Sequence, residues 1–203
     1  MAKVLLFNGS PHEFGCTYTA LSEVKKTLEQ EGVQADIFWI GKEVRGCVAC
    51  FRCGELKKCV FEDKVNEALA LVPEYDGFVF GAPVYYAGPA GTMCCFMDRL
   101  FMASKGRFAG KLGASVVSCR RGGASASFDR LNKYFGISNM TTVGAQYWNQ
   151  VHGSKPEDVL KDEEGLQSMR FIGKNMAYLI RCREQSGIPF PEFEAKINTS
   201  FIR

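Results

Sequence analysis

Short apolar runs alternate along the chain with stretches in which apolar residues recur every three or four positions. The runs are typical of buried β-strands, and the periodic stretches of amphipathic helices. Leu21, Val24 and Leu28, for example, share one face of a helix that follows the first run. The predicted strands are residues 3–8, 34–40, 77–81, 113–119 and 141–147. The predicted helices are residues 17–30, 88–104, 124–135 and 157–183.

This alternation predicts an α/β fold with a doubly wound five-stranded parallel sheet and helices on both faces. In such sheets a ligand binds beyond the carboxyl ends of the strands, so the loops after residues 8, 81 and 119 are candidate functional segments. Two segments fall outside this plan: a cysteine-rich insertion at 44–63, and a tail at 186–203 whose prolines disfavour helix.

Composition is ordinary for a globular protein, with 46% hydrophobic and 23% charged residues among 203. We therefore expect one domain over residues 1–203. The first apolar run is too short for a signal peptide, which predicts a cytoplasmic protein. The net charge of +3 is not concentrated in any block, so neither a nucleic-acid nor a membrane partner is expected.

The loop between the first strand and the first helix is rich in glycine and hydroxyl residues. It reads Gly-Ser-Pro-His-Glu-Phe-Gly-Cys-Thr at residues 9–17. Free N–H groups at a helix N-terminus suit a phosphate, and Ser10, Thr17 and Thr19 would add hydroxyl donors. The loop matches neither the dinucleotide fingerprint nor the Walker pattern. The alternative is an ordinary turn in which Thr17 caps the helix.

Three motifs together resemble the NAD(P)H-dependent FMN reductase family of the flavodoxin-like fold. They are Gly-Ser-Pro at 9–11, Pro-Val-Tyr-Tyr at 83–86 and Phe-Met-Asp-Arg at 96–99. The resemblance implies an FMN cofactor with NAD(P)H as a transient donor. It also implies phosphate contacts from Ser10, Phe14, Gly15, Cys16 and Thr17, and ribityl and ring contacts from Pro83, Val84, Tyr85 and Tyr86. The alternative for the two tyrosines is packing at a sheet edge.

The loop after the fourth predicted strand would form a third side of the flavin crevice. Its candidate contacts are Cys119, Arg120, Gly122 and Gly123. Glycines allow backbone amides to approach a ring edge closely, whereas Arg120 and Arg121 fit a solvated loop equally well. The segment 147–153 also resembles the family, and its uses are packing, a subunit interface or the flavin site.

Four cysteines lie within thirteen residues, at gaps of two, two and five: Cys47, Cys50, Cys53 and Cys59. The spacing resembles the compact motif of iron-sulfur flavoproteins, which implies a 4Fe-4S cluster whose charge Lys57 and Lys58 would offset. The alternatives are zinc, which usually has two separated Cys-x-x-Cys pairs, and free thiols. For Cys94, Cys95, Cys119 and Cys182 we expect core packing.

These features predict an FMN-dependent oxidoreductase that passes electrons from NAD(P)H to flavin or another acceptor. The alternative is an electron carrier in which ferredoxin reduces FMN through the cluster; a flavin-based redox sensor has least support. Two histidines and no nucleophile elbow argue against a hydrolase. The family resemblance also implies a homodimer or homotetramer.

Overall fold

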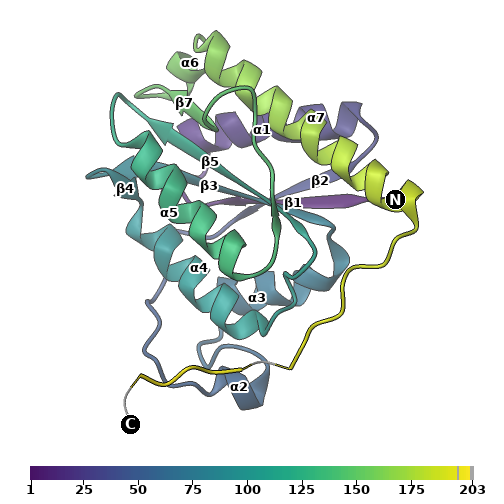
Figure 1. Cartoon of the computed structure of the whole chain (residues 1–203). Coiled ribbons are helices and arrows are strands. Elements are labelled where there is room, and N and C mark those ends of the chain that lie inside the picture. Colours follow the sequence, from purple (N-terminus) through teal and green to yellow (C-terminus); the bar gives the residue numbers. More distant parts are fainter. Residues whose placement is uncertain (196, 202–203) are drawn as a thin grey trace.

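A parallel sheet with helices on both faces forms the centre of the structure, a computed structural model that describes residues 1–195 and 197–201 (Figure 1). Its strand order is β2-β1-β3-β5-β6. The long strands are β1 (Lys3–Asn8), β2 (Gln34–Trp39), β3 (Gly77–Tyr85) and β5 (Leu112–Cys119). This order is that of flavodoxin-like sheets: the strands are parallel, and the order in which the chain adds them reverses between β1 and β3. The predicted fold class is confirmed.

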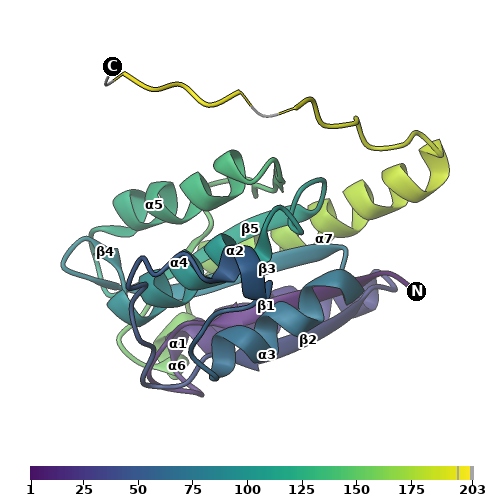
Figure 2. The same cartoon turned by 90° about the horizontal axis from the view of Figure 1, so that it is seen from below.

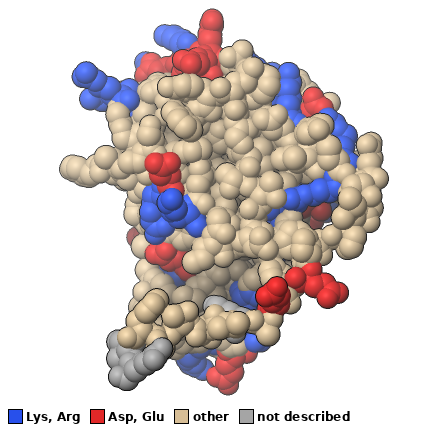
Figure 3. Space-filling view, in the orientation of Figure 1, with Lys and Arg blue, Asp and Glu red and all other residues tan. Residues whose placement is uncertain are grey.

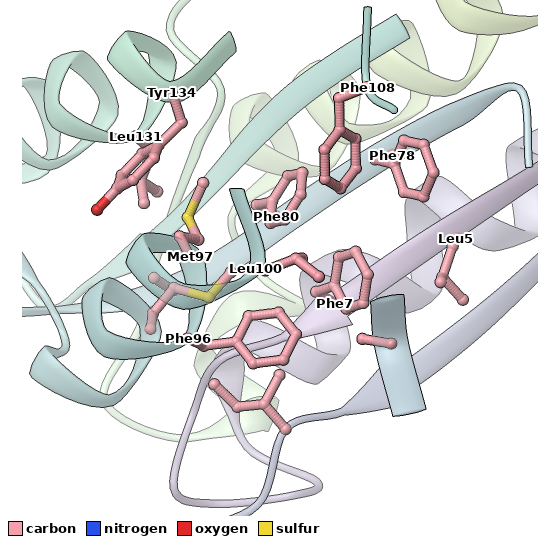
Figure 4. Close-up of a cluster of buried hydrophobic side chains, with 14 of the residues drawn as sticks. Leu5, Phe7, Phe78, Phe80, Phe96, Met97, Leu100, Phe108, Leu131 and Tyr134 are labelled. Atoms are coloured by element: carbon pink, nitrogen blue, oxygen red, sulfur yellow. The ribbon is translucent and has the colours of Figure 1, made fainter. Parts of the chain in front are cut away.

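Alternating residues of the strands face two separate apolar cores. Phe7 and Phe80, with ring centroids 4.9 Å apart, pack under the face covered by α3 (Lys64–Leu71), α4 (Gly91–Ser104) and α5 (Ala124–Ile137). Figure 4 shows this aromatic cluster. Val4 and Leu6 point to the opposite face, against α1 (Cys16–Gln30) and α7 (Glu163–Ser186). This alternation follows from the two-residue period of a strand.

The predicted fifth strand, residues 141–147, is wrong in its extent. On the side of β5 away from β3, the described pairing is limited to β6 (Thr141–Thr142) and β7 (Gln150–His152). The Val143 N–H still donates to the Gly113 carbonyl and the Asn149 carbonyl accepts from the Val117 N–H, so residues 144–148 leave the sheet between them. The Asn149 side chain closes this excursion by donating a hydrogen bond to the Val143 carbonyl at 3.2 Å. This side-chain hydrogen bond joins the two ends of the excursion.

Other elements also differ from the sequence-based expectation. Residues 88–89 form β4 (Gly88–Pro89), which pairs antiparallel with the extended end of β3, so α4 begins only at Gly91. The predicted helix 157–183 is two helices, α6 (Pro156–Val159) and α7, because the Asp162 carboxylate accepts from the Gly165 N–H at 2.9 Å and caps a new helix. Helix α3 was not predicted; Asp63 caps it through the Val65 N–H.

The cysteine-rich insertion contains one short helix, α2 (Cys53–Leu56), and the 3-10 turn η1 (Val72–Glu74) follows α3. After α7 the tail runs outside the helical layers (Figure 2). Residues 196 and 202–203 of the predicted tail lie outside the described part. Among the described residues, no helix combines the length and apolar character needed to cross a membrane. On the face in Figure 3, Lys and Arg are interspersed with Asp and Glu.

Candidate functional site

The loops after β1, β3 and β5 meet at the carboxyl edge of the sheet, around a crevice of about 550 Å³. This is the edge at the β1–β3 switch point, where α/β sheets of this kind bind ligands. The crevice is lined by Ser10, His12, Gly15, Cys16, Thr17, Pro83, Val84, Tyr85, Ser118, Cys119, Arg120, Gly153, Ser154, Lys155 and Pro156. The crevice therefore brings together the three loops predicted from sequence and a fourth segment, residues 153–156, of which only Gly153 was named from sequence.

The first loop is shaped by the buried side chain of Asn8. Its amide donates to the Glu13 carbonyl at 2.8 Å and its carbonyl oxygen accepts from the Ser10 N–H at 3.1 Å. The Ser10 hydroxyl oxygen in turn accepts from the His12 N–H at 3.1 Å. The Ser10 hydroxyl proton is thus available to donate toward the crevice.

The N-terminus of α1 opens into the crevice without a side-chain cap. Its N-cap residue is Gly15, which has no side chain that could hydrogen bond to the first turn. The first N–H groups of a helix have no intrahelical partner and carry partial positive charge, which favours an anion. Together with Ser10, this arrangement fits a phosphate monoester such as that of FMN.

Thr17 does not cap the helix, so the cap given in the alternative interpretation of the loop is wrong. It is the second residue of α1, is buried, and has its hydroxyl oxygen 2.8 Å from that of Ser118 at the end of β5. The pair joins the first and third loops at the crevice. Ser118 was not predicted as a site residue.

The first loop approaches the sheet closely at Gly9. Its N–H donates to the Gly81 carbonyl at 2.8 Å. A Cβ at Gly9 would lie 2.8 Å from the Met93 sulfur and 2.9 Å from the same carbonyl oxygen. Only glycine fits here, which explains the Gly-Ser-Pro motif physically.

On the other side of the crevice, Pro83, Val84 and Tyr85 form the wall that ends β3. Tyr86 and Ala87 follow with positive φ angles of 48° and 60°, and Tyr86 is fully exposed. Gly123, at φ 87°, touches this turn: a Cβ there would lie 2.7 Å from the Ala87 Cα. Gly123 thus lets the β3–β4 turn pack on the start of α5.

The crevice includes some of the predicted contacts and leaves others at its margin. The predicted residues on its wall are Ser10, Gly15, Cys16, Thr17, Pro83, Val84, Tyr85, Cys119 and Arg120. Those outside the wall are Phe14, Thr19, Tyr86, Gly122 and Gly123. Phe14 packs edge-on against Tyr18 with centroids 5.1 Å apart. The Thr19 hydroxyl donates to the Gly15 carbonyl at 3.2 Å.

The wall also includes segment 153–156, of which Gly153 ends the segment 147–153 named from sequence and residues 154–156 were missed. It begins at Gly153, whose N–H donates to the Cys119 carbonyl at 2.9 Å. Its position after the last strand, at the carboxyl edge, was the available signal. Lys155 adds a cation to the crevice wall.

Two crevice thiols stay neutral near pH 7. Burial raises the pKa of Cys16 and, likewise, that of Cys119. The Cys16 thiol lies 3.7 Å from the Gly153 carbonyl oxygen, and Cys119 lies 3.7 Å from that of Arg121. Neither thiol therefore places negative charge beside a bound phosphate.

The four clustered cysteines line a second, apolar cavity of about 160 Å³. Cys47 and Cys50 are exposed, Cys59 is half-buried and Cys53 is buried. Within residues 1–195 and 197–201, no three His, Cys, Asp or Glu side chains lie close enough to hold a single metal ion. This geometry is not a tetrahedral zinc site. A cubane contains four irons and holds its thiolates round a wider centre, so a shared cavity remains compatible with it.

Arg99 is the charged residue of this second cavity, whereas Lys57 and Lys58 are not on its wall. The Arg99 side chain is 1% exposed. Two of its N–H groups donate to the Cys59 sulfur, each at 3.2 Å, and two to the Asp63 carboxylate at 2.7 and 2.9 Å. Burial alone would lower the pKa of Arg99, but these hydrogen bonds raise it.

The other cysteines divide between core and surface. Cys119 is buried, and Cys94 and Cys95 are half-buried, in line with packing. Cys182 is exposed on α7, so core packing was the wrong expectation there. A helix face read from one sequence can be displaced by one position, which suffices to expose a side chain.

Comparison with known proteins shows which family this chain belongs to. Residues 2–154 match the NADPH-dependent FMN reductase family. An iron-sulfur flavoprotein of Methanocaldococcus jannaschii is 30% identical over 88% of this chain and 97% of its own length. An iron-sulfur flavoprotein of Archaeoglobus fulgidus is 32% identical over 54% of this chain, which spans half of that protein.

Solved structures support the fold at much lower identity. RosB, solved with a bound flavin derivative, superimposes with a TM-score of 0.69 at 14% identity, covering all of this chain and 94% of RosB. A flavodoxin from the domain Archaea gives a TM-score of 0.60 at 16% identity, covering 89% and 99% of the two chains. The chain belongs to the NADPH-dependent FMN reductase and iron-sulfur flavoprotein family of flavin oxidoreductases.

Proposed function

We propose that this flavin oxidoreductase binds FMN in the crevice and transfers electrons from NADH or NADPH to a flavin or another acceptor. The observation that carries the proposal is the uncapped N-terminus of α1, which faces the crevice beside Ser10 at the β1–β3 switch point. A phosphate would be held there by backbone N–H groups and the Ser10 hydroxyl. FMN, when bound, supplies the hydride and electron chemistry.

The other crevice walls have separate roles in this proposal. Pro83, Val84 and Tyr85 would contact the ribityl chain and ring, with the Tyr85 ring offering an aromatic surface for stacking. Arg120, on the opposite loop, would stabilise an anionic reduced flavin. Without a dinucleotide fingerprint, NAD(P)H would bind only transiently, over the exposed flavin face.

We also propose that Cys47, Cys50, Cys53 and Cys59 hold a 4Fe-4S cluster. The supporting observation is that all four thiols line one small apolar cavity, with a buried cation beside Cys59. The names of the two archaeal relatives add support. With a cluster, the alternative function is an electron carrier that moves electrons from ferredoxin to FMN.

The assembly proposed for the chain is a homodimer or homotetramer. The tail supports it, since Ile188, Phe193 and Ile197 are largely exposed in a single copy. Apolar side chains of this size are usually covered by a partner when they cluster on one segment.

One experiment tests both cofactors and the donor. Protein purified without oxygen is analysed by absorption spectroscopy and for iron and acid-labile sulfide, then mixed with NADH or NADPH. Flavin bands with about four irons per chain are expected. Bleaching of the flavin by NAD(P)H supports the enzyme, whereas bleaching only by reduced ferredoxin supports the carrier. Failure to bind FMN after reconstitution would overturn the proposal.

A further inference from the structure

We propose that Arg99 is a positioning residue of the cysteine site: it fixes the Cys59 sulfur and, through N–H donors to that sulfur, raises the reduction potential of the cluster. This inference rests on the proposed 4Fe-4S cluster. It assigns a role to a residue of α4 that lies 40 positions from Cys59 in sequence.

Burial makes the hydrogen bonds of Arg99 obligatory. An arginine charge removed from water is stable only when its donors are satisfied. Besides Cys59 and Asp63, Arg99 donates to the Arg45 carbonyl at 3.3 Å and the Phe61 carbonyl at 3.5 Å. Its guanidinium also lies 5.0 Å from the centre of the Phe61 ring. The side chain therefore connects both ends of the cysteine-rich segment to α4.

A purely structural ion pair would not need the sulfur. Asp63 alone satisfies the charge of Arg99, with one contact to each of two nitrogens. Yet the Arg99 Nε, which does not contact Asp63, points at the Cys59 sulfur, and Nη2 shares the same acceptor. A neutral thiol is a weak acceptor, whereas a thiolate bound to iron is a strong one. The donor arrangement thus suits a metal ligand better than a free thiol.

Cys59 is the cysteine that most needs such support. Five residues separate it from Cys53, while the other three follow at gaps of two. A second contact fixes its backbone: the Cys59 N–H donates to the Asn66 side chain at 2.9 Å. Asn66 belongs to α3 and Arg99 to α4. Cys59 is therefore held by two helices rather than by its own loop.

The nearby lysines do not serve in place of Arg99. Lys58 is paired with Glu62 and Lys57 donates to the Gly54 carbonyl at 2.8 Å, both outside the cavity wall. A positive charge and N–H donors on a ligand sulfur favour the more negative, reduced cluster. Removing them lowers the potential.

The test compares Arg99→Lys and Arg99→Gln with Arg107→Gln in the full chain, reconstituted with iron and sulfide. Arg107 is a matched control because it is exposed and donates to the Lys57 carbonyl at 3.0 Å, not to a sulfur. The readouts are the cluster potential from a titration followed by electron paramagnetic resonance, iron release to a chelator, and FMN content.

We expect a lower potential in Arg99→Lys, a larger decrease with about 10- to 100-fold faster iron release in Arg99→Gln, and wild-type values in Arg107→Gln. Arg99→Lys keeps the charge and guards against a folding defect. Wild-type potential and release in both Arg99 variants would overturn the inference while the cluster stands. A wild-type chain that takes up FMN but no iron overturns the cluster proposal, and the inference with it.

Discussion

The Thr17 hydroxyl oxygen lies 2.8 Å from the Ser118 hydroxyl oxygen, although 101 residues separate the two in sequence. Both side chains are buried, and both line the crevice. The start of α1 and the end of β5 are therefore one hydrogen-bonded unit. A change at either residue alters the phosphate loop and the loop on the far side of the crevice together.

Thr17→Val keeps the shape of the side chain but removes its hydroxyl. We expect FMN affinity to fall about tenfold and the free energy of unfolding by about 1–3 kcal/mol, because Ser118 loses its buried partner. Thr19→Val is the control: it is the same change two residues on, outside the crevice wall. Quenching of FMN fluorescence on binding measures the FMN affinity of the two variants. Equal losses of affinity in the two variants would contradict the assignment.

Gly9→Ala tests the close approach of the first loop to β3. Its Cβ would meet the Gly81 carbonyl oxygen, so we expect a loss of about 1–3 kcal/mol of stability and weaker FMN binding. Gly136→Ala is the matched change in α5, with nothing within 4 Å of the new Cβ, and should stabilise by roughly 1 kcal/mol. Urea unfolding measures the stability of the two variants. Similar midpoints for the two variants would argue against a steric role for Gly9.

The affinity for FMN should depend on pH through Cys16. Because burial raises its pKa above the ordinary 9.0, Cys16 remains a neutral thiol at pH values below 9.0. Below pH 9.0, therefore, Cys16 causes no change in FMN affinity with pH. As the pH rises through the raised pKa, a thiolate forms beside the phosphate and the FMN affinity falls. We expect the FMN affinity to fall more in the wild type than in Cys16→Ser when it is measured from neutral to alkaline pH. A decline of equal size in both would assign the effect to another group.

Cys50→Ser separates the cysteine site from the flavin site. We expect loss of most cluster iron and unchanged FMN content, since Cys50 lines only the second cavity. Cys182→Ser is the control, because Cys182 is also exposed but lies on α7, which covers the other face of the sheet. Iron and flavin are assayed on the same samples. Iron loss in both variants would indicate nonspecific binding.

Elements with a strong local signal were predictable from sequence. The helix 17–30 differs from α1 by one residue, and the strand 113–119 from β5 by one, because periodicity and burial coincide there. Helix α3 was missed because it has only eight residues and follows a segment interpreted through its cysteines. The extent of the fifth strand was wrong because the chain leaves the sheet after Val143 and returns at Asn149, and the side-chain hydrogen bond that joins these two residues is encoded by no local pattern.

The site residues, too, include some that could be predicted from sequence and some that could not. The loops carrying Ser10, Tyr85 and Cys119 could be predicted, because they follow apolar strands at one edge of a parallel sheet. Arg99 could not be predicted to face the cysteines, since a charged residue in a helix is normally read as a surface position. Its partners Cys59 and Asp63 are 40 and 36 residues away. Only the packing of α4 against the insertion brings them together.

The interruption between β6 and β7 also affects how the molecule meets other chains. An edge strand with a long row of free N–H and C=O groups can recruit a strand from another molecule. Here the edge next to β5 is two residues of β6 and three of β7, separated by the excursion that Asn149 closes. This edge is too short and discontinuous to extend the sheet into a neighbour. Copies of the chain would therefore not join through this edge, and the same break protects β5 against strand-mediated aggregation.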